Sequence, residues 1–372
     1  MTPTPQQKDS IARLIDKYKE LQQSPRNLGR ANPRRGFSVG MEAPMCWVRV
    51  FGLDVERYFS DPFYYLECEL KHRLWMFENL DDCSMLGDSV NLMLSMYAEY
   101  TFVGLSCTLD ALGVPQLQTD HPLSRTPDLS LLKPVDFCHA GLMPQIMEWH
   151  KILVDFLDGR MKLHVSDWGR GCLDIAIQFR GYDNFIMDTY ERPEFVHGLL
   201  KWLVDERCKW FAQYYKYFDV HTDVCYIGDD WINIPFITPR FFEEFLLPRY
   251  LEIEAFHGNM GNVHSCGNQL EIQKYLLQMK TLRNVEISPW TDMAQTVKNI
   301  PTTKRLGVGI HPNDVLFTTP QKIEEHMKKI TELCAHHPYG VGTSGLTPIT
   351  GSDDDFIRRV RVWTDMAHKY LF

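Results

Sequence analysis

Two residues with metal-binding side chains, His264 and Cys266, stand two positions apart in the segment Val-His-Ser-Cys-Gly. Residues at this spacing on an extended strand point to the same face, so an imidazole and a thiolate could contact one ion. Glu286, near the end of the next apolar run, could add an oxygen ligand. Such an N, S, O set with one open position is typical of a catalytic zinc site. The alternative is a half-buried histidine beside a core cysteine, with Glu286 paired to a lysine or arginine.

Two adjacent carboxylates, Asp229 and Asp230, follow another apolar run at 224–228. Carboxylates at such a place can orient a substrate, act as acid or base, or face water. Because neighbouring residues of an extended segment point to opposite sides, at most one of the two is expected to face a pocket. We expect Asp230 and His311 to be catalytic, and Asp229 and Trp231 to contact the substrate.

The elements that must position these residues are short apolar runs typical of β-strands. They lie at 37–41, 162–166, 224–228, 262–266, 284–288, 305–311 and 339–344. From residue 224 on they alternate with helical patterns, which indicates βαβ units and a parallel sheet. With an eighth strand expected within 80–120, the count favours a (β/α)8 TIM barrel. The competing doubly wound sheet usually carries a glycine-rich phosphate loop after its first strand, and neither GxGxxG nor GxxxxGK[ST] occurs.

Helical spacing of apolar residues predicts helices over 6–23, 55–79 and 193–217, among others. We therefore expect an N-terminal helix and loop over residues 1–35, followed by one barrel domain over residues 36–372. In such a barrel the catalytic groups come from the carboxyl ends of the strands, which is where the residues above stand.

The overall composition excludes several classes of function. The chain of 372 residues is 44% hydrophobic and carries 39 Lys plus Arg against 48 Asp plus Glu, a formal net charge of −9. This balance argues against a nucleic-acid-binding groove. We expect no membrane span, and the N-terminus lacks the apolar core of a signal peptide. Ten scattered cysteines without a CxxC pair are typical of reduced thiols. We expect a cytoplasmic protein.

Several short motifs stand out along the chain. They are Gly228-Asp-Asp230, Ile237-Thr-Pro239, Phe245-Leu-Leu-Pro-Arg249, Val263-His-Ser-Cys-Gly267, the loop His121 to Leu129, and Gly345-Leu-Thr-Pro348. Taken together they resemble the uroporphyrinogen decarboxylase superfamily, and most closely its corrinoid and coenzyme M methyltransferase branch. The resemblance covers roughly residues 35–370 and implies an α/β barrel.

The resemblance implies a zinc site with one altered position. In the methyltransferase branch His-x-Cys binds zinc together with a distant cysteine near the last strand, and an acidic residue completes the site. His264 and Cys266 match, and Glu286 falls where the acidic residue is expected. The segment 341–345 offers Thr343 and Ser344 in place of the distant cysteine. A hydroxyl is a poorer zinc ligand than a thiolate, so zinc affinity should fall and we expect Ser344 to be near substrate instead.

The decarboxylase branch uses arginines near the first strand to bind a polycarboxylate substrate, and this chain lacks them. Here the equivalent stretch, 39–47, has no arginine pair and carries Glu42, which would repel such a substrate. We expect Glu42 to face a different substrate.

The resemblance therefore implies a zinc-assisted methyltransferase that moves a methyl group between a small-molecule donor and a corrinoid or thiol acceptor. The corrinoid would arrive on a partner protein, because 372 residues leave no room for a second, cofactor-carrying domain. Two alternatives stay open. One is a metal-independent decarboxylase or lyase that acts on a small carboxylic acid through Asp230 and His311. The other is a non-catalytic barrel that binds a small molecule or a corrinoid protein.

Overall fold

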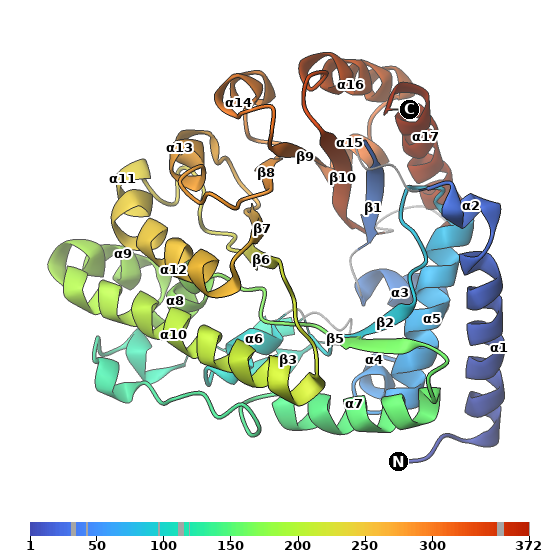
Figure 1. Cartoon of the computed structure of the whole chain (residues 1–372), viewed down its shortest axis with the longest axis horizontal. Coiled ribbons are helices and arrows are strands. Elements are labelled where there is room, and N and C mark those ends of the chain that lie inside the picture. Colours follow the sequence, from blue (N-terminus) through green and yellow to red (C-terminus); the bar gives the residue numbers. More distant parts are fainter. Residues whose placement is uncertain are drawn as a thin grey trace.

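The structure, a computed structural model, describes residues 1–30, 35–41, 44–95, 97–110, 115–118, 120–347 and 353–371. Its centre is a curled sheet of parallel strands (Figure 1). These strands are β1 (Phe37–Met41), β2 (Ser89–Leu92), β5 (Lys162–Val165), β6 (Cys225–Gly228), β7 (Met260–His264), β8 (Asn284–Ile287), β9 (Arg305–Ile310) and β10 (Tyr339–Leu346).

The hydrogen-bonded ladders of this sheet are separate from one another. One has four strands in the order β1-β10-β9-β8, and two further pairs are β2–β5 and β6–β7. A parallel bridge between Arg170 and Gly228 links the segment after β5 to β6. The sheet is therefore curled and partly open, and an uninterrupted eight-stranded barrel is not seen in the described residues. The strand expected within 80–120 is β2, and the short antiparallel hairpin of β3 (Cys107–Leu109) and β4 (Pro115–Leu117) has no counterpart in the predicted elements.

Each strand of the four-stranded ladder presents two chemically different faces. In β9 the side chains of Leu306, Val308 and Ile310 are buried, while Gly307 and Gly309 line a central cavity. In a parallel sheet covered on both sides, strands read as continuous apolar runs. The alternation seen here indicates that only the outer face is packed against helices.

Helices cover the outer face of the sheet (Figure 1). The longer ones are α1 (Pro5–Gln22), α5 (Pro62–Asn79), α7 (Met143–Leu157), α8 (Cys172–Arg180), α9 (Tyr182–Glu191), α10 (Pro193–Phe218), α12 (Leu247–His257), α16 (Pro320–Leu333) and α17 (Asp353–Leu371). Within the described ranges, no helix is long and apolar enough to cross a membrane.

The single helix predicted over 55–79 is wrong, because the structure has two helices there. The short α4 (Val55–Tyr58) ends before α5 begins at Pro62. The carboxylate of Asp61 accepts hydrogen bonds from the backbone N–H groups of Phe63 and Tyr64, at 2.9 and 3.2 Å. An N-cap followed by proline at the first helical position starts a new helix, and this local signal overrides the apolar spacing.

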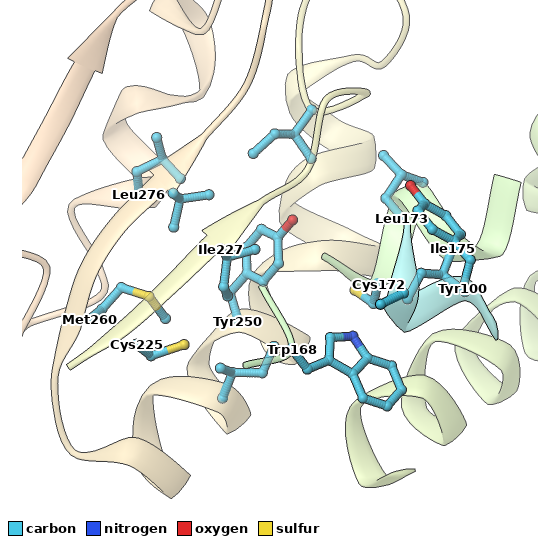
Figure 2. Packing of buried hydrophobic residues seen from close by; sticks show 14 of the residues in the cluster. Tyr100, Trp168, Cys172, Leu173, Ile175, Cys225, Ile227, Tyr250, Met260 and Leu276 are labelled. Carbon is cyan, nitrogen blue, oxygen red and sulfur yellow. The ribbon is translucent and has the colours of Figure 1, made fainter. Parts of the chain in front are cut away.

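The apolar interior lies between the sheet and the helices, and it fixes the ends of β6 and β7. Figure 2 shows Ile227 of β6 and Met260 of β7 packed near Tyr250 of α12 and Trp168, which follows β5. The hydroxyl of Tyr214 on α10 donates to the carbonyl of Val165 at 2.6 Å. These contacts between the outer helices and the strands fix the positions of the carboxyl ends of the strands, where the site residues lie.

A close backbone approach holds the short helix α6 (Ala98–Phe102) against the turn before α7. Gly141 has φ of +50°, and a Cβ there would stand 2.1 Å from Thr101 Oγ1 and 2.5 Å from the Thr101 carbonyl carbon. The same hydroxyl accepts a hydrogen bond from Leu142 N at 3.1 Å.

We expect Gly141→Ala to lower the free energy of unfolding by ~3 kcal/mol, since left-handed strain and overpacking add together. Gly159 is the matched control, because it has φ of +69° with nothing within 4 Å of a built Cβ. Gly159→Ala should lose only ~1 kcal/mol, from left-handed strain alone. Chemical denaturation of both variants measures the difference, and equal losses would contradict the predicted clash.

Candidate functional site

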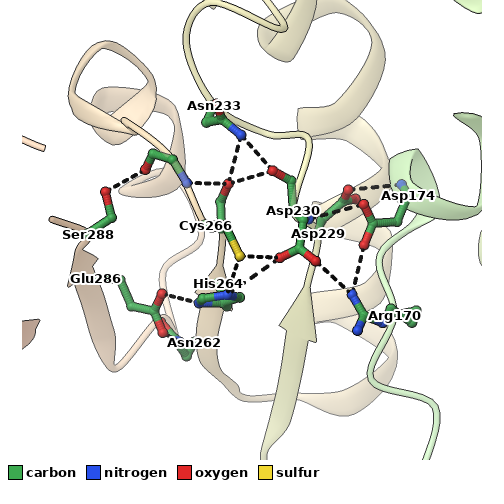
Figure 3. Close-up of polar contacts among 12 residues, drawn as sticks. Arg170, Asp174, Asp229, Asp230, Asn233, Asn262, His264, Cys266, Glu286 and Ser288 are labelled. Atoms are coloured by element: carbon green, nitrogen blue, oxygen red, sulfur yellow. Dashed lines mark hydrogen bonds and ion pairs between the residues drawn. The ribbon is translucent and has the colours of Figure 1, made fainter. Parts of the chain in front are cut away.

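The predicted site residues meet where β6 and β7 end. Gly228, the last residue of β6, pairs with His264, the last residue of β7. The turn after β6 carries Asp230 and the turn after β7 carries Cys266, so that neighbouring strand ends bring these side chains together (Figure 3).

Asp230, His264 and Cys266 form a compact cluster of three potential metal ligands, with one ligand atom of each within 4.8 Å of the others. The Cys266 thiol donates to Asp230 Oδ1 at 3.1 Å. His264 Nε2 lies 3.5 Å from Cys266 Sγ and 3.5 Å from Asp230 Oδ1. The Asp230 side chain is 38% exposed, so the cluster is open to ligands.

Glu286 contacts this cluster from a different side than predicted. Its Oε2 lies 2.6 Å from His264 Nδ1, on the opposite side of the imidazole from Cys266 and Asp230. Its Oε1 accepts a hydrogen bond from the Asn262 amide. Glu286 is therefore outside the three-residue cluster, in which the oxygen atom belongs to Asp230, and the predicted ligand set of His264, Cys266 and Glu286 stays a prediction. Glu286 fixes the orientation of the imidazole instead, as carboxylates next to metal-binding histidines do.

The protonation of His264 reflects this surrounding charge. Burial alone would lower the pKa of His264, but hydrogen bonds to Cys266 and Glu286 outweigh it and raise the pKa to about 10. The imidazole therefore holds a proton firmly unless another cation takes its place.

Arg170 and Asp174 complete the site, and the sequence analysis missed both. Arg170 Nη1 donates to Asp230 Oδ2 at 3.0 Å and to Asp174 Oδ2 at 3.1 Å. Asp174 Oδ1 accepts from the Asp230 backbone N–H at 3.1 Å. Asp230 is thus held at its backbone and at one oxygen, which leaves Oδ1 directed at His264 and Cys266. The available signal was a Gly-Arg-Gly turn after β5 followed by an acidic residue four positions beyond the arginine.

Asp229 does not reach the cavity, and its predicted contact with substrate is corrected. Its side chain is 0% exposed. Its carboxylate accepts hydrogen bonds from the backbone N–H groups of Leu173 and Asp174, at 3.0 and 2.9 Å, and from the Tyr250 hydroxyl at 2.6 Å. Asp229 therefore caps the N-terminus of α8, where free N–H groups and the helix dipole favour an anion.

Of the other predicted site residues, His311 lies at the cavity and Trp231 is not among its described lining residues. His311 lines the cavity, accepts from Asn313 N at 3.1 Å and packs edge-on against Trp290. Trp231 stacks on Tyr182 with 5.2 Å between ring centroids and is not among the described residues that line the cavity, and its predicted substrate contact stays a prediction. Glu42 and the side chain of Ser344 lie outside the described residues.

The site opens into one large cavity of about 1650 Å³ inside the curled sheet. Glu99 also lines this cavity, although its side chain is only 8% exposed, and it accepts from Gly169 N at 3.0 Å. Burial raises the pKa of Glu99 to about 7. Such a carboxyl group can give or take a proton near neutral pH, which marks functional sites in many enzymes. No pattern in the sequence around residue 99 pointed to it.

Mutation of the two adjacent aspartates should lower the free energy of unfolding by different amounts. Asp229→Ala removes the cap of α8 and leaves the buried Tyr250 hydroxyl unsatisfied, so we expect the free energy of unfolding to fall by ~3 kcal/mol. Asp230→Ala removes a partly exposed contact and should cost less than ~1 kcal/mol while abolishing function at the site. Denaturation curves of both variants test this, and a larger loss for Asp230→Ala would reverse the assignment.

Glu99 should make stability depend on pH. Its pKa in the folded protein, about 7, lies above the ordinary value of ~4.3. The fold therefore favours the protonated form, and this stabilisation is lost as pH rises from about 4 through about 7. Glu99→Gln should exceed the wild type in free energy of unfolding by ~3 kcal/mol at pH 8, with little difference at pH 4. A pH-independent difference in urea denaturation would contradict this.

Comparisons with known proteins agree with the motifs. A family model described as uroporphyrinogen decarboxylase (URO-D) matches residues 85–349. Among solved structures, a methyltransferase from Methanosarcina mazei has a TM-score of 0.63 at 14% sequence identity, over 95% of this chain and 97% of that chain. That likeness establishes a shared fold. No curated protein matches the sequence. Because the family model covers more than half of the residues, the chain belongs to the uroporphyrinogen decarboxylase family.

Proposed function

We propose that the chain is a metal-assisted methyltransferase whose metal site is formed by Asp230, His264 and Cys266. The observation that carries the proposal is the convergence of one carboxylate oxygen, one imidazole nitrogen and one thiol within 4.8 Å in the lining of a large cavity. Acid–base chemistry alone does not require a thiol in this position, whereas zinc chemistry commonly uses one.

The spacing of the three atoms fits a zinc ion. Tetrahedral ligands at ordinary zinc bond lengths lie ~3.4 to 3.6 Å from one another. The distances here are 3.1 Å from Cys266 Sγ to Asp230 Oδ1, and 3.5 Å from His264 Nε2 to each of the other two atoms. Three protein ligands leave the fourth position for substrate. A zinc ion bound there would supply a Lewis acid that activates a thiol acceptor or polarises a methyl donor.

Neighbouring residues orient the three proposed metal ligands. The Glu286 carboxylate holds His264 Nδ1, so that Nε2 faces Asp230 and Cys266. Arg170 partly neutralises Asp230 and fixes its second oxygen. We infer that His311, which lines the same cavity, exchanges a proton with a substrate group.

We further propose that the methyl group passes to or from a corrinoid carried by a partner protein, as the family resemblance implies. The corrinoid would supply the metal-bound methyl carrier. We also infer that the curled sheet is a (β/α)8 barrel with interrupted hydrogen bonding, which the number of parallel strands and the similarity in fold to the Methanosarcina methyltransferase support. We also infer a cytoplasmic location, which the lack of disulfide bonds among the described cysteines supports.

A metal-independent lyase or decarboxylase that acts on a small carboxylic acid is the second candidate. It is favoured by Glu99, a buried carboxyl group in the cavity with a pKa of about 7. The zinc content of the purified protein and the absorbance change on adding cobalamin distinguish the two functions. Protein that binds no zinc and causes no change in the cobalamin spectrum, but still converts a carboxylic acid, would establish the second.

Zinc analysis of two cysteine variants tests the proposed site. Wild-type protein purified without chelator should hold about one zinc ion per chain. Cys266→Ala should lose most of it without unfolding, because a metal site at the ends of strands adds little to the apolar core. Cys138→Ala is the matched control, since Cys138 is also an exposed free thiol but lies away from the cavity. Unchanged zinc in Cys266→Ala would refute the site.

A further inference from the structure

Two adjacent strands each carry an asparagine two positions before a residue of the site. Asn262 precedes His264 on β7, and Asn284 precedes Glu286 on β8. Side chains two positions apart on a strand point to the same face, and both asparagines line the cavity. Asparagine is disfavoured in β-strands, and the proposed function uses neither amide. The two residues therefore require an explanation.

A chain of hydrogen bonds joins these four side chains. Asn284 Nδ2 donates to Asn262 Oδ1 at 3.3 Å. Asn262 Nδ2 in turn donates to Glu286 Oε1, and Figure 3 shows these two side chains next to each other. Glu286 Oε2 lies 2.6 Å from His264 Nδ1. The chain crosses between β8 and β7 three times, and it ends on the imidazole of a proposed metal ligand.

The direction of these hydrogen bonds follows from the groups involved. An ionised carboxylate only accepts hydrogen bonds, so the part of the Asn262 amide that faces Glu286 must be the NH2 group. The carbonyl of the same amide then faces Asn284, which must donate. If the Asn262 amide turned over, two oxygens would meet at Glu286 and two NH2 groups would meet at Asn284. Asn284 therefore holds Asn262 in the orientation in which Asn262 donates to Glu286.

A glycine on the next strand leaves room for the first amide of the chain. Gly307 of β9 pairs with Glu286 in the sheet. A Cβ built on Gly307 would stand 2.9 Å from Asn284 Nδ2 and 3.4 Å from Asn284 Oδ1. A side chain at position 307 would therefore displace the Asn284 amide from its place beside Asn262.

We propose that Asn262 and Asn284 are positioning residues of the site. They orient the Glu286 carboxylate, which holds His264 Nδ1 and leaves Nε2 directed at the other proposed metal ligands. The importance of this orientation for a metal ion rests on the proposed function, but the hold on the imidazole does not. Asn284 has its effect only through Asn262, and this order can be tested.

Zinc affinities of leucine variants, measured by chelator competition, test the order of the chain. Hydrogen-bond partners of metal ligands contribute about 10- to 100-fold to metal affinity, so Asn262→Leu should weaken zinc binding by about tenfold or more. Asn284→Leu should weaken it by about threefold, and the double variant should match Asn262→Leu alone. Asn91→Leu is the control, because Asn91 is exposed on β2 and is not among the described residues of the cavity lining. Losses that add in the double variant would overturn the proposed order.

A glycine variant tests the chain without changing any of its four members. Gly307→Ala should displace the Asn284 amide and weaken zinc binding by about threefold. Gly309→Ala is the matched control, because Gly309 lies on the same face of β9 and a Cβ there would come no closer than 3.4 Å, to the Ile287 carbonyl oxygen. If Asn262→Leu fails to fold, this pair still decides. Equal zinc affinities in the two glycine variants would overturn the role of Asn284.

The proton on His264 Nδ1 provides a measurement that needs no metal. A proton held between an imidazole and a carboxylate is in a strong, charge-assisted hydrogen bond. Zinc-free wild type labelled with 15N-histidine should therefore show a downfield NMR signal that is absent from His264→Gln. Asn262→Leu and Asn284→Leu should broaden this signal by faster exchange with water, and Asn91→Leu should not. A wild type without the signal would overturn the inference.

The two measurements together separate this inference from the proposed function. If the wild type binds no zinc but both asparagine variants broaden the Nδ1 signal, the proposed metal site fails and the positioning role stands. If zinc is bound and neither its affinity nor the signal changes in the variants, the positioning role fails and the metal site stands. Weaker zinc binding with an unchanged Nδ1 signal would show that the amides do not act through the imidazole, which also overturns the inference.

Discussion

The buried carboxylate of Asp229 is the constraint on which the site depends. It satisfies two N–H groups at the start of α8 and the hydroxyl of Tyr250 on α12, and it has no exposed surface. A Cβ on Gly171 would stand 2.2 Å from this carboxylate. The residue before α8 must therefore be glycine for the start of α8 to approach Asp229. One carboxyl group therefore joins the end of β6 to two outer helices. With Asp229 directed outward, the next residue, Asp230, stands in the turn after β6, where Arg170 binds its carboxylate and Asp174 accepts from its backbone N–H.

The second constraint is the contrast between the two faces of the strands. On the outer face, aliphatic side chains such as Val285, Ile287 and Val308 pack against helices and provide the stability. On the inner face of β9 and β10, glycines replace the branched side chains that fill the interior of many α/β barrels. The cavity therefore exists because these inner positions carry no side chains, and the packing on the outer face of the strands is unaffected. The inner face leaves space for a ligand, and the outer face provides the stability.

The sequence was sufficient for the positions of most strands and for the meeting of His264 with Cys266, because both follow from short-range periodicity. The partition between Asp229 and Asp230 was only half predictable: alternation indicates that one faces the cavity, but the choice depends on α8, more than fifty residues earlier in the chain. Glu286 was placed in the right region, yet strand order cannot tell which imidazole nitrogen a carboxylate contacts. Arg170 and Glu99 lie in segments with weak patterns, and only the tertiary structure brings them to the cavity.

The electrostatics of the cluster favour a cation at His264 Nε2. Glu286 lies on one side of the imidazole and Asp230 on the other, while Arg170 is bound to the far oxygen of Asp230 and to Asp174. Hydrogen bonds to Cys266 and Glu286 overcome the opposing effect of burial and raise the pKa of His264 to about 10. A proton on Nε2 and a divalent ion beside it would respond to the same negative potential, and binding of the metal that we propose would displace that proton. The second charge of such an ion and a bond to the thiolate would favour the exchange. The residues that surround the imidazole therefore determine both its protonation and its suitability as a ligand.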